Sequence, residues 1–187
     1  SNIPGIHNVQ NVLAVCAMAS ELGVPLNVIK SALDGFEGVN RRFSLIKNFK
    51  GVKIFDDYGH HPVEIKATLA AAREISSNKV IAVVQPHRYS RLKILFEEFT
   101  SAFNDADTVF ITDIYAAGES KPEDMSNEIL INSLLSAGHK DPRSYDSKEL
   151  KRIVENNLQE GDILVFLGAG DITNKAKLFV NKYLEDY

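Results

Sequence analysis

The densest group of chemically capable side chains in this sequence lies between residues 56 and 62. The run Asp56-Asp57-Tyr58-Gly59-His60-His61-Pro62 holds two carboxylates, a phenol and two imidazoles in seven residues. It follows the strand-like residues 52–55 and precedes a helical pattern, so we predict a strand-to-helix turn, where α/β proteins bind ligands. The alternative is a plain connector that ends the strand, makes the turn and starts the helix. That alternative leaves Tyr58 and His60 without a role.

Three other turns that follow predicted strands also carry polar or charged side chains. They are residues 85–91 (Gln-Pro-His-Arg-Tyr-Ser-Arg), 113–119 (Asp-Ile-Tyr-Ala-Ala-Gly-Glu) and 168–171 (Gly-Ala-Gly-Asp). The carboxyl ends of parallel strands share one edge of a sheet, so these turns and residues 56–62 should converge in space. The sequence therefore predicts one site at that edge.

The turn at residues 85–91 places His87, Arg88 and Arg91 where a helix is expected to begin. A guanidinium group can bind a carboxylate or a phosphate through two parallel hydrogen bonds. Cations are unfavourable at a helix N-terminus because of the helix dipole, so we expect an anionic ligand at this place. The alternative is that both arginines are solvated surface residues.

The remaining two turns carry less specific signals. The turn that holds Tyr115 and Glu119 could position a cation or an amine, or it could be an ordinary polar loop. The glycines of residues 168–170 could let backbone amides approach a phosphate, but close packing of strand and helix explains them equally well. We expect no zinc site, because adjacent histidines such as His60 and His61 rarely face one ion and the usual zinc-ligand spacings are absent.

A further group of candidate ligand-binding residues lies near the N-terminus, where His7, Asn8 and Asn11 begin a predicted helix. His7 and Asn11 are four residues apart and can therefore share a helix face. An imidazole ring can stack on a base, and an Asn amide can read adenine as donor and acceptor together. The simpler alternative makes Asn8 a helix cap and His7 a surface residue.

The elements that position these residues follow from the hydrophobic pattern. Residues 7–22 and 25–36 read as two apolar helices with no strand between them, so we interpret residues 1–37 as the end of a preceding domain. A linker with two glycines leads to an α/β domain over residues 41–187. That domain should open with an antiparallel hairpin and continue as a mostly parallel sheet with helices on both faces. The expected strands are 43–46, 52–55, 80–84, 108–112, 143–145 and 163–167, and the expected helices are 62–76, one that carries Leu92 to Phe103 on a single face, 126–138, 146–158 and 171–183.

Composition limits the class of protein. The 187 residues carry a net charge of −4 without a basic block, which argues against nucleic acid as a partner. Cys16 is the only cysteine, so an internal disulfide is impossible and a reducing cytoplasm fits. No apolar run is long enough to span a bilayer. We therefore expect a cytoplasmic protein that acts on small molecules and not on a membrane.

Together, these motifs resemble the C-terminal part of Mur ligases, the ATP-dependent family that forms amide bonds in peptidoglycan synthesis. Gly5-x-His7-Asn8-x-x-Asn11, Arg41-Arg42-Phe43 and residues 56–62 occur in the order of that family. Residues 56–62, 85–91 and 113–119 are similar to the branch that joins L-alanine to UDP-N-acetylmuramate. The resemblance implies a Rossmann-like C-terminal domain, ATP and magnesium as cofactors, and ATP, L-alanine and UDP-N-acetylmuramate as substrates.

The resemblance also implies a role for each matching residue. A nucleotide set would hold adenine with His7 and Asn11, the ribose with Asp57 and the phosphates with Arg42. The full nucleotide set is His7, Asn8, Asn11, Arg42, Asp57 and Tyr58. The substrate set is Tyr58, His60, His61, His87, Arg88, Arg91, Tyr115 and Glu119. The catalytic candidates are Arg42, His60, His87, Arg88 and Arg91, because cations and donors must neutralise the charge of the tetrahedral oxyanion.

The family's phosphate-binding loop, magnesium ligands, modified lysine and UDP-binding domain would all lie upstream of residue 1. The chain would then be a ligase fragment that is inactive alone, and we assign no metal ligand within it. The alternative is a stand-alone nucleotide-binding or regulatory module without catalysis. The two helices that precede the α/β domain argue against that alternative.

Overall fold

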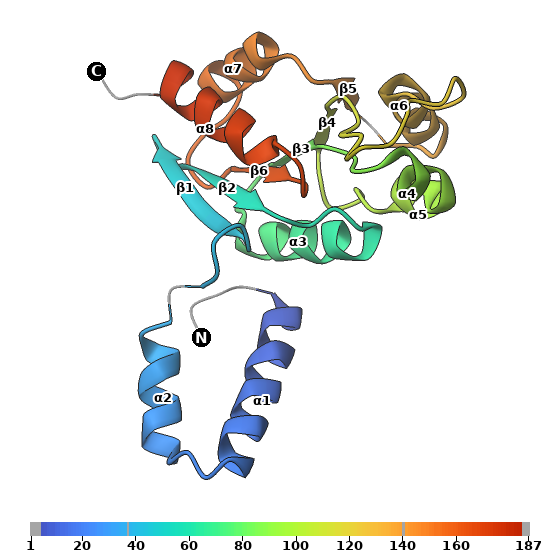
Figure 1. The fold of residues 1–187 in the computed structure, drawn as a ribbon. Helices are drawn as coiled ribbons and strands as arrows, with labels where there is room; N and C mark the ends of the chain where they lie inside the picture. Colours follow the sequence, from blue (N-terminus) through green and yellow to red (C-terminus); the bar gives the residue numbers. More distant parts are fainter. Residues whose placement is uncertain (1–4, 37, 140, 185–187) are drawn as a thin grey trace.

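The computed structural model describes residues 5–36, 38–139 and 141–184. Its centre is a six-stranded sheet with the strand order β1-β2-β6-β3-β4-β5 (Figure 1). β1 (Ser44–Phe49) and β2 (Val52–Asp57) form an antiparallel hairpin. The other neighbours pair in parallel, and these strands are β3 (Val80–Val84), β4 (Thr108–Ile111), β5 (Pro142–Ser144) and β6 (Ile163–Leu167). The predicted mostly parallel sheet and its opening hairpin are confirmed.

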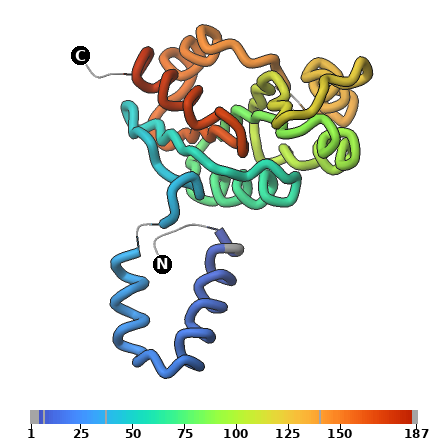
Figure 2. Tube along the Cα trace, in the orientation of Figure 1, coloured from blue at the N-terminus to red at the C-terminus, as the bar shows by residue number. Residues whose placement is uncertain are grey.

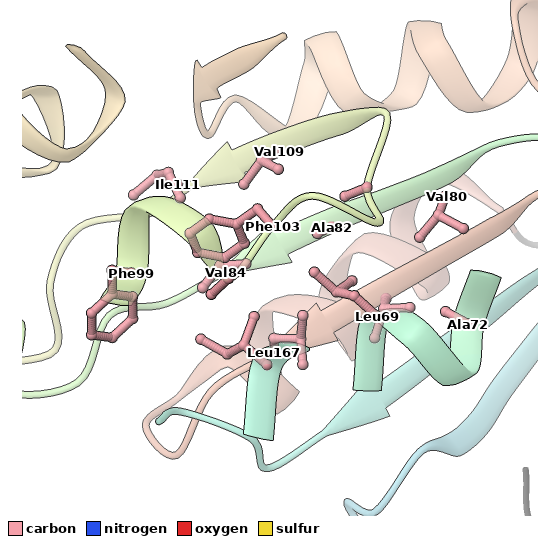
Figure 3. Close-up of a cluster of buried hydrophobic side chains, with 14 of the residues drawn as sticks. Leu69, Ala72, Val80, Ala82, Val84, Phe99, Phe103, Val109, Ile111 and Leu167 are labelled. Carbon is pink, nitrogen blue, oxygen red and sulfur yellow. The ribbon is translucent and has the colours of Figure 1, made fainter. Parts of the chain in front are cut away.

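Helices cover both faces of the sheet. Every residue of β3 and β6 is buried, which explains why these strands read as continuous apolar runs. The side chains of one face pack under α3 (Pro62–Ile75), α4 (Tyr89–Ile94), α5 (Phe96–Ser101) and α6 (Asn127–Ser136). Figure 3 shows part of this layer, with Leu69 and Phe103 near Val84 and Leu167. The other face packs under α7 (Ser147–Asn156) and α8 (Ile172–Tyr183).

The first two helices lie apart from these layers. α1 (Ile6–Glu21) and α2 (Leu26–Asp34) run side by side as a hairpin below the rest of the chain (Figure 2). Ile29 is buried, whereas Leu13, Met18 and Leu22 are 63%, 67% and 80% exposed. Within the part of the chain that the structure describes, no helix is both long and apolar enough to cross a membrane.

Two local expectations are wrong. The helix predicted to carry Leu92 to Phe103 is divided into α4 and α5, because Leu95 adopts a non-helical backbone with φ −107 and ψ 26. Leu92 and Phe99 on either side of this break are both buried, so packing on the sheet prevails over continuous helical hydrogen bonding. Asp56 and Asp57 belong to β2 and not to the following turn, since parallel pairing with β6 continues through both residues.

Candidate functional site

The turns that follow β2, β3, β4 and β6 converge at the carboxyl edge of the sheet, as the sequence predicts. His87 and Tyr115 form an isolated parallel bridge between the turns after β3 and β4. The backbone N–H of Arg88 donates to the Tyr115 carbonyl at 2.8 Å. Gln85 Nε2 donates to the Asp171 carboxylate, which joins the turn after β3 to the start of α8. One surface is therefore built from segments that are far apart in the sequence.

Four rings stand next to one another along this edge, and we call them the aromatic row: Tyr58, His60, His87 and Tyr115. The ring centroids are 5.3 Å apart between Tyr58 and His60, 5.5 Å between His60 and His87, and 5.3 Å between His87 and Tyr115. The last pair is stacked, whereas the first is edge-to-face. The row places two imidazoles between two phenols, so ring nitrogens and hydroxyl groups that can form hydrogen bonds lie beside apolar ring faces.

The two adjacent histidines of the turn after β2 have different roles. His60 Nδ1 lies 3.0 Å from the Tyr58 carbonyl oxygen and 3.6 Å from Glu64 Oε2. His61 Nδ1 instead accepts the backbone N–H of Val63, while Glu64 accepts the backbone N–H groups of both histidines. This is a capping box at the start of α3. The helix-start alternative therefore describes His61 well, but it does not account for the His60 ring.

Arg42 and Glu64 form the charged side of this turn. Arg42 Nη1 lies 3.7 Å from Glu64 Oε1, and the guanidinium lies 5.4 Å from the centre of the Tyr58 ring. The Arg42 side chain is 53% exposed and can reach a ligand. Burial alone would raise the pKa of Glu64, but the backbone donors of His60 and His61 and the charges nearby outweigh burial and lower it.

His87 is held in one hydrogen-bonding state by its neighbours. Arg91 Nη1 lies 3.2 Å from His87 Nδ1. Because a guanidinium has no acceptor, this nitrogen of His87 must accept, and the ring hydrogen lies on Nε2. Burial lowers the pKa of His87, and the positive charges of His60, Arg91 and Arg88 lower it further. His87 is therefore a neutral ring that presents an N–H group.

The helix-dipole argument for the two arginines holds only in part. Arg88 is the N-cap of α4, but Arg91 lies in the last turn of this six-residue helix, where a cation is favoured. The anion at the helix start is supplied by Glu119, whose carboxylate lies 3.9 Å from Arg88 Nη1 and accepts both the N–H and the hydroxyl of Ser90. These Ser90 hydrogen bonds are the main reason why the pKa of Glu119 is lowered. The expectation that both arginines need an external anion is therefore corrected.

Asp57 is more strongly bound within the chain than the sequence suggests. Its side chain is nearly buried, and its carboxylate accepts the N–H of Phe43 at 2.7 Å, the N–H of Gly59 at 2.7 Å and the hydroxyl of Thr68 at 3.2 Å. A carboxylate offers about four acceptor positions, so one remains for a ligand. Asp57 therefore ties β1, the turn after β2 and α3 together at the wall of a cleft.

That cleft lies between the α1–α2 hairpin and α3 and has a volume of about 710 Å³. Pockets for small ligands commonly measure roughly 300–1,000 Å³. Asn8 and Asn11 line one wall, Asp57 lies on the opposite side, and Arg42 also borders the cleft. The rest of the lining is mostly apolar: Val12, Val15, Leu33, Phe36, Val39, Phe43, Val63 and Ala67. The structure thus brings four members of the predicted nucleotide set, Asn8, Asn11, Arg42 and Asp57, to one cavity, whereas Tyr58 is not among its lining residues.

Two qualifications concern the predicted adenine contacts. The His7 side chain lies outside the described residues, so its position in the cleft stays a prediction. The alternative that Asn8 caps the first helix is wrong, because the N-cap of α1 is Gly5, with φ 100 and no side-chain cap bond. A glycine fits this left-handed position without the steric cost that other residues incur.

Arg41 is a residue that sequence reasoning missed. Its Nη2 donates to the carbonyls of Gly168 at 2.8 Å and Gly170 at 3.4 Å, and its guanidinium lies 4.8 Å from the centre of the Tyr58 ring. Its Nε lies 3.9 Å from the buried carboxylate of Asp56. Arg41 therefore connects the segment before β1 to the turn before α8. The only signal in the sequence was the pair Arg41-Arg42, in which we assigned a role to the second residue alone.

The glycines of the turn after β6 are explained by close packing. A Cβ on Gly168 would lie 3.1 Å from the Gln85 backbone oxygen, and a Cβ on Gly170 would lie 2.4 Å from Gln85 Oε1 and 2.6 Å from the Tyr115 ring. Both carbonyls already accept hydrogen bonds from Arg41. This decides between the two alternatives in favour of packing.

Comparison with known proteins gives the chain a family. The family model described as "Mur ligase, glutamate ligase domain" matches residues 41–170. UDP-N-acetylmuramate–L-alanine ligase of Chelativorans sp. (strain BNC1) is 53% identical over 175 residues, which cover 93% of this chain and 38% of that relative. The protein of the same name from Paramagnetospirillum magneticum is 53% identical over 173 residues, covering 92% of this chain and 36% of the relative.

A solved structure agrees with the sequence relatives. The crystal structure of UDP-N-acetylmuramate-alanine ligase from Thermotoga maritima superposes with a TM-score of 0.77 and 33% identity, covering 97% of this chain and 38% of that one. The chain thus spans less than two fifths of the length of the relatives that it matches.

Proposed function

The chain belongs to the Mur ligase family, and on that premise we propose that it is the C-terminal part of a ligase that joins L-alanine to UDP-N-acetylmuramate with ATP. One observation carries the proposal: Arg42 belongs to two sites. It borders the cleft that holds Asn8, Asn11 and Asp57, and its guanidinium also lies over Tyr58, the first ring of the aromatic row. A phosphate group held by Arg42 would therefore stand between a nucleotide and the edge of the sheet.

The cleft would bind the nucleoside of ATP. Its apolar lining suits a base, and the amides of Asn8 and Asn11 can supply paired donors and acceptors to adenine. The remaining acceptor position of Asp57 suits a ribose hydroxyl. Arg42, which is half-exposed, would reach the phosphates. His7 is proposed as a further adenine contact on the basis of the family resemblance alone.

The other end of the row would bind the amino acid and the acyl group. ATP phosphorylates the muramate carboxylate to an acyl phosphate, and the amine of L-alanine then attacks its carbonyl carbon. Negative charge grows on the substrate, so a row bordered by Arg42, Arg88 and Arg91 is suited to stabilise it. Tyr58, His61, Tyr115 and Glu119 complete the proposed substrate set, and Glu119 acts there mainly by holding the start of α4.

Magnesium would accompany ATP in such a reaction. Among residues 5–36, 38–139 and 141–184, no group of three or more His, Cys, Asp or Glu side chains is placed to hold a metal ion. We therefore assign no metal ligand to these residues and no step of the reaction to a metal held by them. The proposal also includes a cytoplasmic location, where ATP and the UDP-linked substrate are available.

We further propose that residues 1–37 belong to the preceding ATP-binding domain and that residues 41–187 form a separate domain. On this reading the chain alone should neither form the amide nor hydrolyse ATP, because it lacks a Gly-x-x-x-x-Gly-Lys-[Ser/Thr] loop. Deletion of residues 1–35 should abolish the nucleotide cleft but leave a cooperatively unfolding α/β domain. Loss of cooperative unfolding in this deletion, measured by urea titration, would contradict the division.

The function is tested in the full-length ligase with two arginine variants. Arg91→Ala should raise the KM for L-alanine or lower kcat, while the Kd for ATP stays unchanged. One lost charge-assisted hydrogen bond is worth about 1.5–3 kcal/mol, or roughly ten- to hundredfold. Arg42→Ala should instead weaken ATP binding, measured by calorimetry. Normal alanine kinetics with lost ATP binding in Arg91→Ala would show that Arg91 serves the nucleotide.

A further inference from the structure

The described histidine rings do not all carry their hydrogen on the same nitrogen. His60 Nδ1 faces the Tyr58 carbonyl, which can only accept, so Nδ1 must donate and Nε2 keeps its lone pair when the ring is neutral. The other three rings have the opposite arrangement. Nδ1 accepts from Val63 N–H in His61, from Arg91 in His87 and from Asp141 N–H in His139, so Nε2 carries the hydrogen.

We propose that the two histidines of the aromatic row have opposite chemical roles: His60 Nε2 accepts the proton of the incoming amine, His87 Nε2–H donates a hydrogen bond to the developing oxyanion, and Arg91 positions His87 by fixing its tautomer. This inference rests on the proposed ligase function. It differs from that function in assigning each ring nitrogen a task, which neither the family resemblance nor the spacing of the residues supplies.

His60 has the surroundings of a general base. On its Nδ1 side lie the Tyr58 carbonyl and, at 3.6 Å, the Glu64 carboxylate, and both stabilise the ring once it is protonated. Glu64 is fixed by two backbone donors in the capping box, so it cannot turn away without disturbing α3. A carboxylate behind a histidine that receives a proton is the arrangement that orients the base in hydrolytic triads. Arg42 engages the other oxygen of Glu64.

His87 cannot serve as the base. Arg91 occupies its Nδ1, and the ring is surrounded by positive charge from His60, Arg88 and Arg91, which Glu119 only partly opposes. Two positively charged imidazoles whose centres are 5.5 Å apart would repel each other. The Glu64 carboxylate lies beside His60 and the arginines lie beside His87, so this geometry assigns the proton of the amine to His60.

The proton balance of the step is simple. The ammonium group of L-alanine first gives one proton to His60 Nε2. The neutral amine then gives its electron pair to the carbonyl carbon, and its second proton goes to the departing phosphate. The carbonyl oxygen carries negative charge while the intermediate is tetrahedral, and His87 Nε2–H stabilises it together with the arginines. The bond from carbon to the phosphate oxygen then breaks, and phosphate leaves with the electron pair.

The tautomers can be read directly from this chain by long-range ¹H–¹⁵N correlation spectra of its histidine rings, assigned with single His→Gln variants. We expect Nδ1–H in neutral His60 and Nε2–H in neutral His87, with His139, outside the site, as the reference for the second form. Arg91→Ala should change the tautomer ratio of His87 and leave that of His139 unchanged. Nε2–H in His60, or Nδ1–H in His87, would overturn the inference whatever the enzyme does.

The roles are tested in the full-length ligase with hydroxylamine as a second nucleophile. Hydroxylamine is already neutral at neutral pH, so its attack needs no prior proton transfer. His60→Gln should slow amide formation with L-alanine by about 10²–10⁴-fold, the usual contribution of a general base, but should largely retain hydroxamate formation. His87→Gln keeps an amide donor near the position of Nε2 and should reduce both products about tenfold or less.

Two outcomes separate the inference from the function on which it rests. Equal loss of amide and hydroxamate in His60→Gln would show that His60 is not the base, although the ligase function would stand. Failure of the wild-type ligase to form either product would refute the ligase function and with it both proton roles. The spectra would still decide the tautomers independently.

Discussion

α1 and α3 are both rich in apolar residues, but their side chains end in opposite environments. In α3, Ile65 and Leu69 are fully buried against the sheet. In α1, Leu13 and Met18 are about two-thirds exposed, at 63% and 67%. An apolar helix indicates that a partner surface is needed, but not where this surface lies. For α3 the partner is the sheet of the same chain, and for α1 we propose that it is the remainder of the ligase.

The largest contrast is expected between core positions of the two regions. Phe166 is fully buried in β6 and packs on Phe179. Phe166→Ala should lower the free energy of unfolding by about 3–5 kcal/mol, through lost burial and the cavity left behind. Leu13→Ala in α1 should change it by less than about 0.5 kcal/mol. Urea titration of both variants measures this, and a large loss in Leu13→Ala would show that α1 is part of the same folding unit.

A second contrast concerns two aspartates. Asp57→Ala removes the acceptor of three hydrogen bonds and leaves the N–H groups of Phe43 and Gly59 unpaired, so it should cost about 3 kcal/mol of unfolding free energy. Asp34→Ala, at the exposed end of α2, should cost less than about 0.5 kcal/mol. Equal unfolding midpoints for the two variants would mean that Asp57 is not the connection between β1 and α3 that the geometry indicates.

A third contrast uses two glycines. An added methyl group at Gly170 would meet Gln85 and the Tyr115 ring at less than 3 Å, so Gly170→Ala should destabilise the fold by about 1–3 kcal/mol. At Gly35 the same methyl group would meet only a backbone oxygen at 3.6 Å, and φ is an ordinary −90. Gly35→Ala should therefore be close to neutral. Thermal unfolding checks both variants, and a neutral Gly170→Ala would show that the turn can shift.

The smallest contrast lies within α3 and depends on pH. The pKa of Glu64 is lower in the folded chain than its ordinary value of 4.5, so ionised Glu64 stabilises the fold above that pH. The contribution is lost as the pH falls through the lower folded-state pKa. Glu64 is partly exposed, so Glu64→Gln should cost no more than about 1 kcal/mol near neutral pH and less in acid. Glu74→Gln, at the exposed end of α3, is the matched control for removing one charge from the same helix. A pH-independent difference would contradict the assignment.

The sequence by itself determined the convergence of the polar turns and the order and type of the elements, except for the break that divides α4 from α5. Period-two and continuous apolar runs define strands, and a parallel sheet must bring the carboxyl ends of its strands to one edge. The approach of His87 to Tyr115 was therefore predictable from residues 85–91 and 113–119, without any knowledge of distances. The family motifs indicate which residues form the site, and the parallel sheet explains why these residues lie together.

Only the tertiary structure decided how individual atoms are used. Spacing does not show that Arg41 reaches across to the Gly168 carbonyl, or that Asp57 is largely occupied by donors of its own chain. It also cannot tell His60 from His87, because the two rings are chemically identical until their neighbours are known. The position of the proton on an imidazole depends on whether Nδ1 meets a carbonyl or a guanidinium. For His60 and His87 these partners are only two and four residues away, so the backbone conformation of each turn decides which atom Nδ1 meets. Arg41 and Gly168 are instead 127 residues apart, and only the fold brings them together.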